Sequence, residues 1–84
     1  MFYVYVLKSS KDTNLYYGST NDLRRRLTEH NLGKVRSTKT RGPFELRYYE
    51  AYFNEVDARS REWSLKKDGK ALAQLRRRLE NSLR

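Results

Sequence analysis

The alternation of hydrophobic and polar residues along the chain predicts three strands. Two runs rich in aromatic and β-branched residues, FYVYVL at 2–7 and LYYGS at 15–19, flank the polar segment 9–14, which predicts the turn of an antiparallel hairpin. A third aromatic run, FELRYYEAYF at 44–53, predicts another strand. These runs contain all seven tyrosines, so much of the apolar surface of the sheet carries hydroxyl groups.

Capping residues and leucine spacing predict three helices. The first follows the polar residues 20–22, any of which can cap it, and ends near Leu32 with Gly33 just beyond. The second begins after Asn54 and ends before Gly69. The last is amphipathic, and its apolar side carries leucines at three- and four-residue steps: Leu72, Leu75, Leu79 and Leu83.

The order of these elements, β-β-α-β-α-α, predicts an α+β fold in which a three-stranded antiparallel sheet is flanked by about three helices. No internal repeat, linker or low-complexity tract interrupts the pattern, so residues 1–84 are expected to form a single domain. The segment KVRSTKTRGP at 34–43 is polar and basic, and we expect it to be a loop with room for a short helical turn.

The hairpin raises the question of whether its tyrosines carry chemistry. Side chains alternate along a strand, so Tyr5 lies on the face opposite to its apolar neighbours. An even-length turn around residues 10 and 11 pairs Tyr5 directly with Tyr16 and places their hydroxyls side by side, whereas an odd-length turn breaks this pairing. The alternative is that both tyrosines only fill a half-buried face.

Arg26 and His30 lie four residues apart on the first predicted helix, at the edge of its buried leucine stripe. Arg26 is therefore the least solvated arginine of the RRR run. Its planar guanidinium matches a phosphate or a carboxylate, and a carboxylate partner within the protein is either Glu29 or Glu62. His30 belongs to the same site or is a surface residue near the helix end.

Glu62 interrupts the inward arc of the second predicted helix, which Ala58 and Leu65 also share. A half-buried carboxylate needs a cationic partner or a bound cation. Arg59 and Lys66 have the helical spacing to pair with it. The alternative is a hard cation such as Mg²⁺, which prefers oxygen ligands and keeps most of its water.

The formal charge of +9 indicates a polyanionic partner, with nucleic acid ahead of an anionic membrane surface. The chain has no cysteine and one histidine, which excludes a zinc site built from these residues, so a metal must be bound by carboxylates. No signal peptide or membrane-spanning run is visible, so the expected location is the cytoplasm.

The basic loop is the predicted phosphate-binding segment. Its cations and hydroxyls are the residue types that dominate phosphate contacts, and six are assigned to substrate binding: Lys34, Arg36, Ser37, Thr38, Lys39 and Arg41. Arginines 76–78 extend this track or form a solvated helix face. Such contacts carry no sequence information, so we expect recognition of DNA structure, such as single strands, ends or flaps.

The spacing of the candidate residues resembles that of the GIY-YIG nuclease superfamily, in particular its small stand-alone bacterial members related to the N-terminal nuclease domain of the excision-repair incision subunit. The matching positions are YVY at 3–5, YYG at 16–18, Arg26, His30 and Glu62. Tyr3 stands where the GIY motif has glycine, and Tyr17 stands where the YIG motif has isoleucine. The resemblance covers nearly the whole chain and implies a metal-dependent DNA endonuclease, active in DNA repair or processing.

The resemblance also implies roles for individual residues. Tyr5 matches the tyrosine that activates or positions the attacking water, and Tyr16 lines the same pocket. Arg26 holds the scissile phosphate, His30 assists proton transfer or phosphate contact, and Glu62 is the sole protein ligand of one Mg²⁺ or Mn²⁺ ion. Two further positions are possible members of the site: Gly18, where the backbone passes close to a neighbour or substrate, and Asn81, the only asparagine near the chain end.

Two other functions are compatible with the same residues. One is a non-catalytic nucleic-acid-binding module on the nuclease scaffold, which binds without cleaving. The other is a small RNA-binding or ribosome-associated protein, in which exposed tyrosines stack on bases and Glu62 is only a salt bridge. The occupied catalytic positions favour the nuclease. A monomer is expected.

Overall fold

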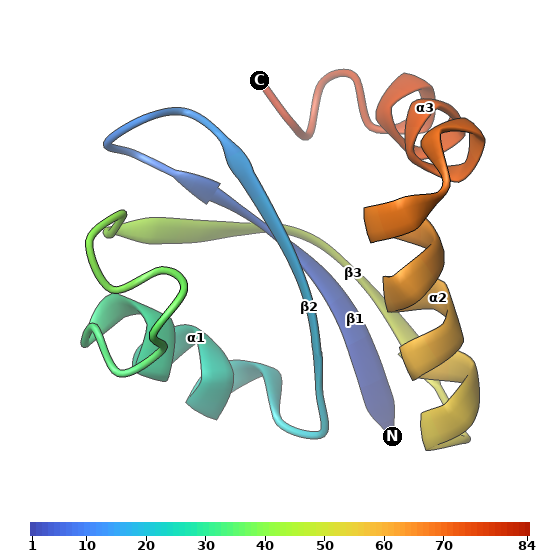
Figure 1. Cartoon of the computed structure of the whole chain (residues 1–84), viewed down its shortest axis with the longest axis horizontal. Coiled ribbons are helices and arrows are strands. Elements are labelled where there is room, and N and C mark those ends of the chain that lie inside the picture. The colour runs from blue at the N-terminus through green and yellow to red at the C-terminus, as the bar shows by residue number, and fades with distance from the viewer.

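The computed structural model describes residues 1–84 and has the predicted order of elements (Figure 1). The six elements are β1 (Phe2–Ser9), β2 (Leu15–Thr20), α1 (Leu23–Asn31), β3 (Phe44–Tyr52), α2 (Glu55–Lys67) and α3 (Gly69–Arg78). The strands form one antiparallel sheet in the order β2-β1-β3, with α1 on one face and α2 and α3 on the other (Figure 1). The predicted α+β fold is thereby confirmed. None of the helices has the length and apolar character needed to cross a membrane.

Each face of the sheet has its own hydrophobic cluster because side chains alternate along β1. Val4 and Val6 pack on the α2 and α3 side, with Ala58, Leu65 and Leu75. Tyr5 and Leu7 pack on the α1 side, and the residues around them are Phe44, Leu23, Leu27, Leu46 and Tyr16. Tyr17 contacts the first cluster, as expected for the residue that follows Tyr16.

The hairpin register differs from the predicted one. Tyr5 pairs with Gly18, and Tyr16 pairs with Leu7. The turn has even length but is centred one residue later than expected, because the buried Ser9 closes it: its hydroxyl accepts hydrogen bonds from the amides of Lys11 (3.1 Å) and Asp12 (3.2 Å). The direct Tyr5–Tyr16 pair was therefore wrong, although both side chains still point to the α1 face as diagonal neighbours.

Local capping sets the helix boundaries. Asp22 caps α1 by accepting a hydrogen bond from the Arg25 amide at 3.0 Å, and Gly33 follows the helix with φ of 73°, in the left-handed region that glycine favours. Asn54 caps α2 as predicted. Asp68 ends α2 and also caps α3. The last helix is shorter than the leucine pattern predicts. It ends at Arg78, and the chain continues as a turn.

A polar cluster on β3 fixes the orientation of α2. Glu50 accepts hydrogen bonds from the hydroxyls of Tyr48 and Tyr52 and a bidentate pair from Arg61, at 3.0 and 3.1 Å. Burial raises the pKa of the Glu50 carboxyl, but Arg61 and the two tyrosines outweigh it, and the pKa falls below its usual value. Because Arg61 is held here, the next residue of the helix, Glu62, is turned toward β2.

Candidate active site

A buried hydrogen-bonded chain connects β1, α1 and the basic loop. The Tyr5 hydroxyl lies 2.9 Å from Nε2 of His30, and Nδ1 of His30 lies 2.7 Å from the Thr38 hydroxyl. All three side chains are buried. The Thr38 hydroxyl also lies 3.5 Å from the carbonyl oxygen of Val35, to which it can donate, and we therefore assign the proton of His30 to Nδ1. The imidazole therefore presents Nε2 as an acceptor to the Tyr5 hydroxyl.

The pKa values of Tyr5 and His30 in this hydrogen-bonded network are shifted so that both side chains are neutral at neutral pH. Burial, reinforced by the Arg26 charge, lowers the pKa of His30 to about 4. Burial raises the pKa of Tyr5 to about 12, although the Arg26 guanidinium beside the hydroxyl opposes the rise. At pH 7, Tyr5 is thus the donor and His30 the acceptor.

The lowered pKa of His30 makes folding stability depend on pH. An unfolded histidine binds a proton below about pH 6.5, whereas the folded one resists protonation down to about pH 4. The stabilisation from neutral His30 is fully present above pH 6.5 and is lost as the pH falls toward 4, by up to about 3 kcal/mol. Denaturant unfolding at pH 7 and pH 4.5 measures the loss, and His30→Gln is expected to flatten the difference.

The chain contains one histidine, so its single set of imidazole NMR signals tests the same expectation directly. The signals are expected to titrate near pH 4. Titration near pH 6.5 in the folded protein would contradict it.

Gly18 allows the Tyr5 ring to lie across β2. A Cβ atom at Gly18 would lie 2.6 Å from Cζ of Tyr5 and collide with its hydroxyl. The predicted close approach of backbone to a neighbour is therefore seen, and the neighbour is Tyr5. The Tyr16 ring packs against the same group, with its centroid 5.0 Å from that of His30 and 6.4 Å from that of Tyr5.

Arg26 lies at the open side of this aromatic group. Its Nη1 donates to Glu29 at 3.1 Å, one of the two protein partners considered from the sequence. About a third of its side chain remains exposed (35%), and it also lines a surface groove. The guanidinium therefore has donors left for a phosphate oxygen.

Glu62 lies on the α2 side of the same strand. Its carboxylate accepts hydrogen bonds from the Ser19 hydroxyl (2.5 Å) and from the Lys66 ammonium (2.7 Å). Burial raises its pKa, but Lys66 and Ser19 lower it further, so the carboxylate is ionised at neutral pH. Arg59, the other partner considered from the sequence, pairs instead with Glu55 at 3.1 Å.

The aromatic residues on the α1 face and the Glu62 carboxylate on the α2 face come close to each other at the edge of β2. Tyr5 and Tyr16 face α1, whereas Ser19 faces α2, and β2 is an edge strand that no further strand covers. Lys66 spans the edge, since its ammonium bonds Glu62 and lies 5.6 Å from the Tyr16 ring centroid.

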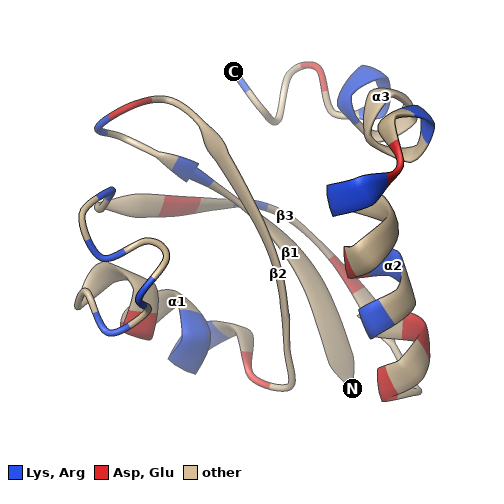
Figure 2. Cartoon of the chain, viewed as in Figure 1, with Lys and Arg blue, Asp and Glu red and all other residues tan.

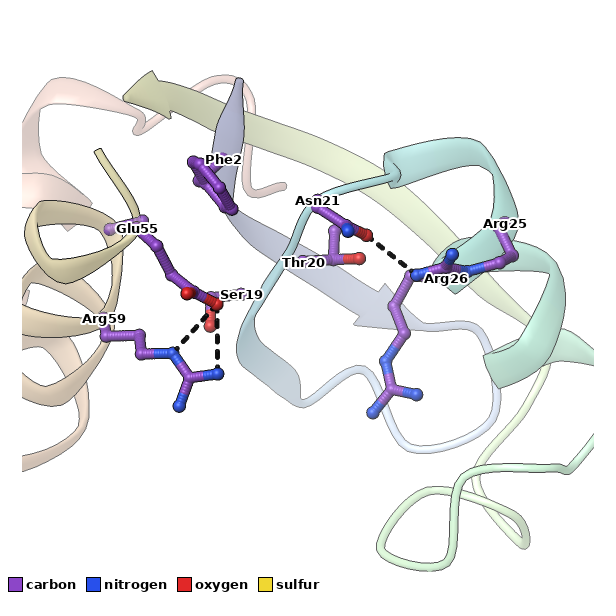
Figure 3. A pocket seen from close by; sticks show the side chains of 9 residues that line it. Phe2, Ser19, Thr20, Asn21, Arg25, Arg26, Glu55 and Arg59 are labelled. Atoms are coloured by element: carbon purple, nitrogen blue, oxygen red, sulfur yellow. Dashed lines mark hydrogen bonds and ion pairs between the residues drawn. The ribbon is translucent and has the colours of Figure 1, made fainter. Parts of the chain in front are cut away.

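A polar groove of about 280 Å³ lies between the starts of α1 and α2, beside this edge. Figure 3 shows Arg25 and Arg26 on one wall, Glu55 and Arg59 on the other, and the end of β2 between them. The groove thus contains three guanidinium groups next to the Ser19–Glu62 pair. Sequence reasoning did not assign Ser19 or Arg59 to the site. For Arg59, the only feature of the sequence that pointed to the site was its helical spacing from Glu62. For Ser19, no feature of the sequence did.

The donor set at Glu62 fits a hydrated hard cation. No group of three or more histidine, aspartate or glutamate side chains converges anywhere in the molecule, which leaves one ionised carboxylate with the Ser19 hydroxyl beside it. Mg²⁺ is commonly held by one or two carboxylates and retains several waters. Lys66 occupies the second carboxylate oxygen and has to move aside for such an ion.

The loop residues assigned to phosphate binding fall into two groups. Four are exposed and make no ion pair: Lys34, Arg36, Ser37 and Lys39. Thr38 is fully buried and bonds His30, so in this structure its hydroxyl is turned to the imidazole and away from the surface that a substrate reaches. Arg41 pairs with Asp12 at 3.0 Å and lies over the Phe44 ring. Figure 2 shows the basic residues of this loop beside α1.

Asn81 lies in the turn after α3, away from Glu62. This turn bonds to Lys8 and Arg47 through backbone carbonyls. Lys8 pairs with Leu15, at the opposite end of β2 from Ser19. The structure therefore does not bring Asn81 to the site. Arginines 76–78 are exposed at the end of α3.

Comparison with known families agrees with this geometry. A family model described as the GIY-YIG catalytic domain matches residues 1–79. The chain therefore belongs to the GIY-YIG family, a family of nuclease domains, and the resemblance seen in the sequence is confirmed.

Within the family, the chain is similar to small bacterial proteins named UPF0213. One from Clostridium perfringens is 47% identical over 68 residues, which cover 80% of this chain and 72% of that protein. Another from Oceanobacillus iheyensis is 42% identical over 65 residues, covering 76% and 74%. The solution NMR structure of a UPF0213 protein from Bacillus halodurans has 35% identity and a TM-score of 0.54, covering 89% of this chain and 82% of that one.

Proposed function

We propose that the protein is a metal-dependent DNA endonuclease that hydrolyses phosphodiester bonds, selects DNA by structure rather than sequence, and acts in DNA repair or processing. One observation carries the proposal. The Tyr5–His30–Thr38 network, Arg26 and Glu62 come from one strand, two helices and a loop, yet they gather around the edge strand β2, beside an arginine-lined groove.

Glu62, with the Ser19 hydroxyl beside it, is the residue that would hold one Mg²⁺ or Mn²⁺ ion. When bound, the ion stabilises negative charge on the phosphate and helps the leaving oxygen depart. Arg26 orients the scissile phosphate from the opposite wall and stabilises the charge that develops on its oxygens. Arg26 would thus act on the phosphate together with an ion held at Glu62.

Proton transfer from the attacking water follows from the donor order in the buried chain. The Tyr5 oxygen accepts a proton from water while its own proton passes to Nε2 of His30, and the hydroxide bonds to phosphorus. His30 is then the imidazolium, and its Nδ1–H remains bonded to Thr38. Because burial disfavours this charge, the proton returns through Tyr5 toward the leaving oxygen or to solvent. Tyr16 packs on the imidazole and keeps its orientation.

The substrate backbone is held by charge. The exposed cations of the basic loop, and Arg25 and Arg59 of the groove, are the groups that bind it, and the whole chain carries +9. Contacts of this kind attract any phosphate backbone and weaken as salt rises. They supply no base readout, which is the reason for proposing structural selectivity.

The proposal is tested by incubating the purified protein with labelled single-stranded, duplex and branched DNA, in Mg²⁺, Mn²⁺ or chelator, beside RNA of matched sequence. We expect cleavage of DNA that contains unpaired segments, dependent on the divalent ion. Absence of cleavage on every DNA substrate, with binding intact, would overturn it.

The Lys66–Glu62 ion pair favours one alternative, a non-catalytic nucleic-acid-binding module. In such a module, Lys66 neutralises the carboxylate permanently and binding is the same in Mg²⁺ and in chelator. Lys66→Ala separates the two functions. It is expected to increase the apparent affinity for the divalent ion if the protein is a nuclease, and to leave cleavage absent if it is the module.

A further inference from the structure

The outward side of α2 carries an exposed apolar hollow that the proposed catalytic residues do not use. The Trp63 side chain is 63% exposed and Val56 is 68% exposed. Together with Arg59, Ser60 and Ser64 they line a shallow hollow of about 380 Å³. Val56 and Trp63 line the same hollow, and adjoining exposed apolar groups mark interaction surfaces more often than singly exposed ones do.

The hollow is continuous with the polar groove beside the edge of β2. Arg59 lines both, so it borders the groove that contains Arg26 as well as the hollow that contains Trp63. Arg59 is 72% exposed, and its pair with Glu55 is a surface ion pair, which contributes little and exchanges readily. A backbone phosphate that lies between the groove and the hollow can therefore replace Glu55 as the partner of the Arg59 guanidinium.

The chemistry of the hollow matches a nucleobase. A flat indole offers a stacking surface, the hydroxyls of Ser60 and Ser64 offer hydrogen bonds to base edges, and Arg59 supplies the charge for the adjoining phosphate. A second copy of the chain fits the surface less well, because each copy carries +9.

We propose that this hollow is a subsite for one unpaired base of a DNA strand, which stacks on Trp63 while Arg59 holds the phosphate between the hollow and the groove. The placement of the scissile phosphate near Arg26 rests on the proposed function, but the subsite itself does not. A base inside a duplex is paired and stacked on its neighbours, so it cannot enter. The subsite thus selects strands with unpaired nucleotides next to the cleavage position.

The single tryptophan of the chain makes the subsite directly observable, because intrinsic indole fluorescence reports on Trp63 alone. The protein is titrated in chelator, where no divalent ion is present, with oligothymidylate and with an abasic oligonucleotide of the same length. We expect oligothymidylate to quench the fluorescence. The abasic strand is expected to bind through its phosphates and leave the fluorescence unchanged.

Variants measured by fluorescence anisotropy of labelled strands complete the test. Trp63→Ala is expected to weaken binding of oligothymidylate by about 5- to 150-fold, the range for loss of one stacked base, and to leave the affinity for the abasic strand unchanged. Trp63→Phe retains an aromatic face and is expected to recover part of the loss. The matched control is Leu32→Ala, an exposed apolar residue beyond the end of α1, which is expected to change neither affinity.

Three results would overturn the subsite. They are unchanged fluorescence at saturating oligothymidylate, equal weakening of both strands in Trp63→Ala, and a concentration-dependent shift of the emission without DNA, which would show a second copy on the surface. Cleavage without quenching would refute the subsite alone. Quenching without cleavage on any substrate would refute the nuclease function and leave the subsite standing.

Discussion

Replacement of Glu62 by glutamine is expected to abolish metal-dependent cleavage while the protein remains folded and bound to DNA. Glutamine keeps the shape of the side chain and its contact with Ser19 but removes the charge that holds the ion. Loss of groups that only support a metal ligand already costs about 10- to 100-fold, so loss of the ligand itself is expected to exceed about 100-fold. The measurement is the cleavage rate at saturating Mg²⁺ and DNA, with binding followed by anisotropy.

The matched control is Asp57→Asn, which removes the same charge from an exposed position on the same helix. It is expected to leave the cleavage rate unchanged. Folding of Glu62→Gln is checked by denaturant unfolding, where loss of its exposed ion pair with Lys66 is expected to cost about 0–1 kcal/mol. Cleavage at the wild-type rate in Glu62→Gln would show that the carboxylate is not the metal ligand.

Replacement of Gly18 by alanine is expected to damage both stability and cleavage. The added Cβ collides with the Tyr5 ring, which is buried between β2 and α1 and cannot move without leaving His30. Overpacking of a filled core costs about 1–3 kcal/mol in the free energy of unfolding. The displaced ring also loses its hydrogen bond to His30. We therefore expect the cleavage rate at saturating DNA and Mg²⁺ to fall even under conditions where the variant is fully folded.

Gly69→Ala is the matched control, since nothing lies within 4 Å of a Cβ placed there and the residue opens α3. It is expected to be neutral or slightly stabilising. To separate the loss of cleavage from the loss of stability, the cleavage rates are measured at a temperature below the unfolding transition, where both variants are folded. A Gly18→Ala variant with wild-type stability would show that the Tyr5 ring is free to shift away from β2.

The elements of this fold could be predicted because their signals are local. Alternation along β1 sorted its residues onto two faces, and Asn54 and Gly33 marked helix ends through their own backbone preferences. The helical spacing of Arg26 and His30 likewise placed both at one edge of α1. Membership of the GIY-YIG family could be recognised from a few residues, Tyr5, Tyr16, Arg26 and Glu62, and from their order along the chain.

The hairpin register could not be predicted, because it depends on the turn, and the turn depends on a contact made elsewhere. The Ser9 hydroxyl is buried and also donates to the Arg41 carbonyl of the basic loop, so a residue 32 positions away helps to set the turn. The same applies to Thr38, which read as a phosphate-binding hydroxyl in a basic segment. Packing of the loop against α1 turned it inward to His30.

The amino-acid sequence by itself thus determined which residues lie on strands, on helices and on their inward sides, since these follow from periods of two and about 3.6 residues and from caps. Only the tertiary structure decided which of them meet. The contacts of Ser19 with Glu62 and of His30 with Thr38, and the place of Arg59 between the groove and the hollow, depend on how the helices and the basic loop dock on the two faces of the sheet. Docking is set by packing across the sheet, and no short segment encodes it.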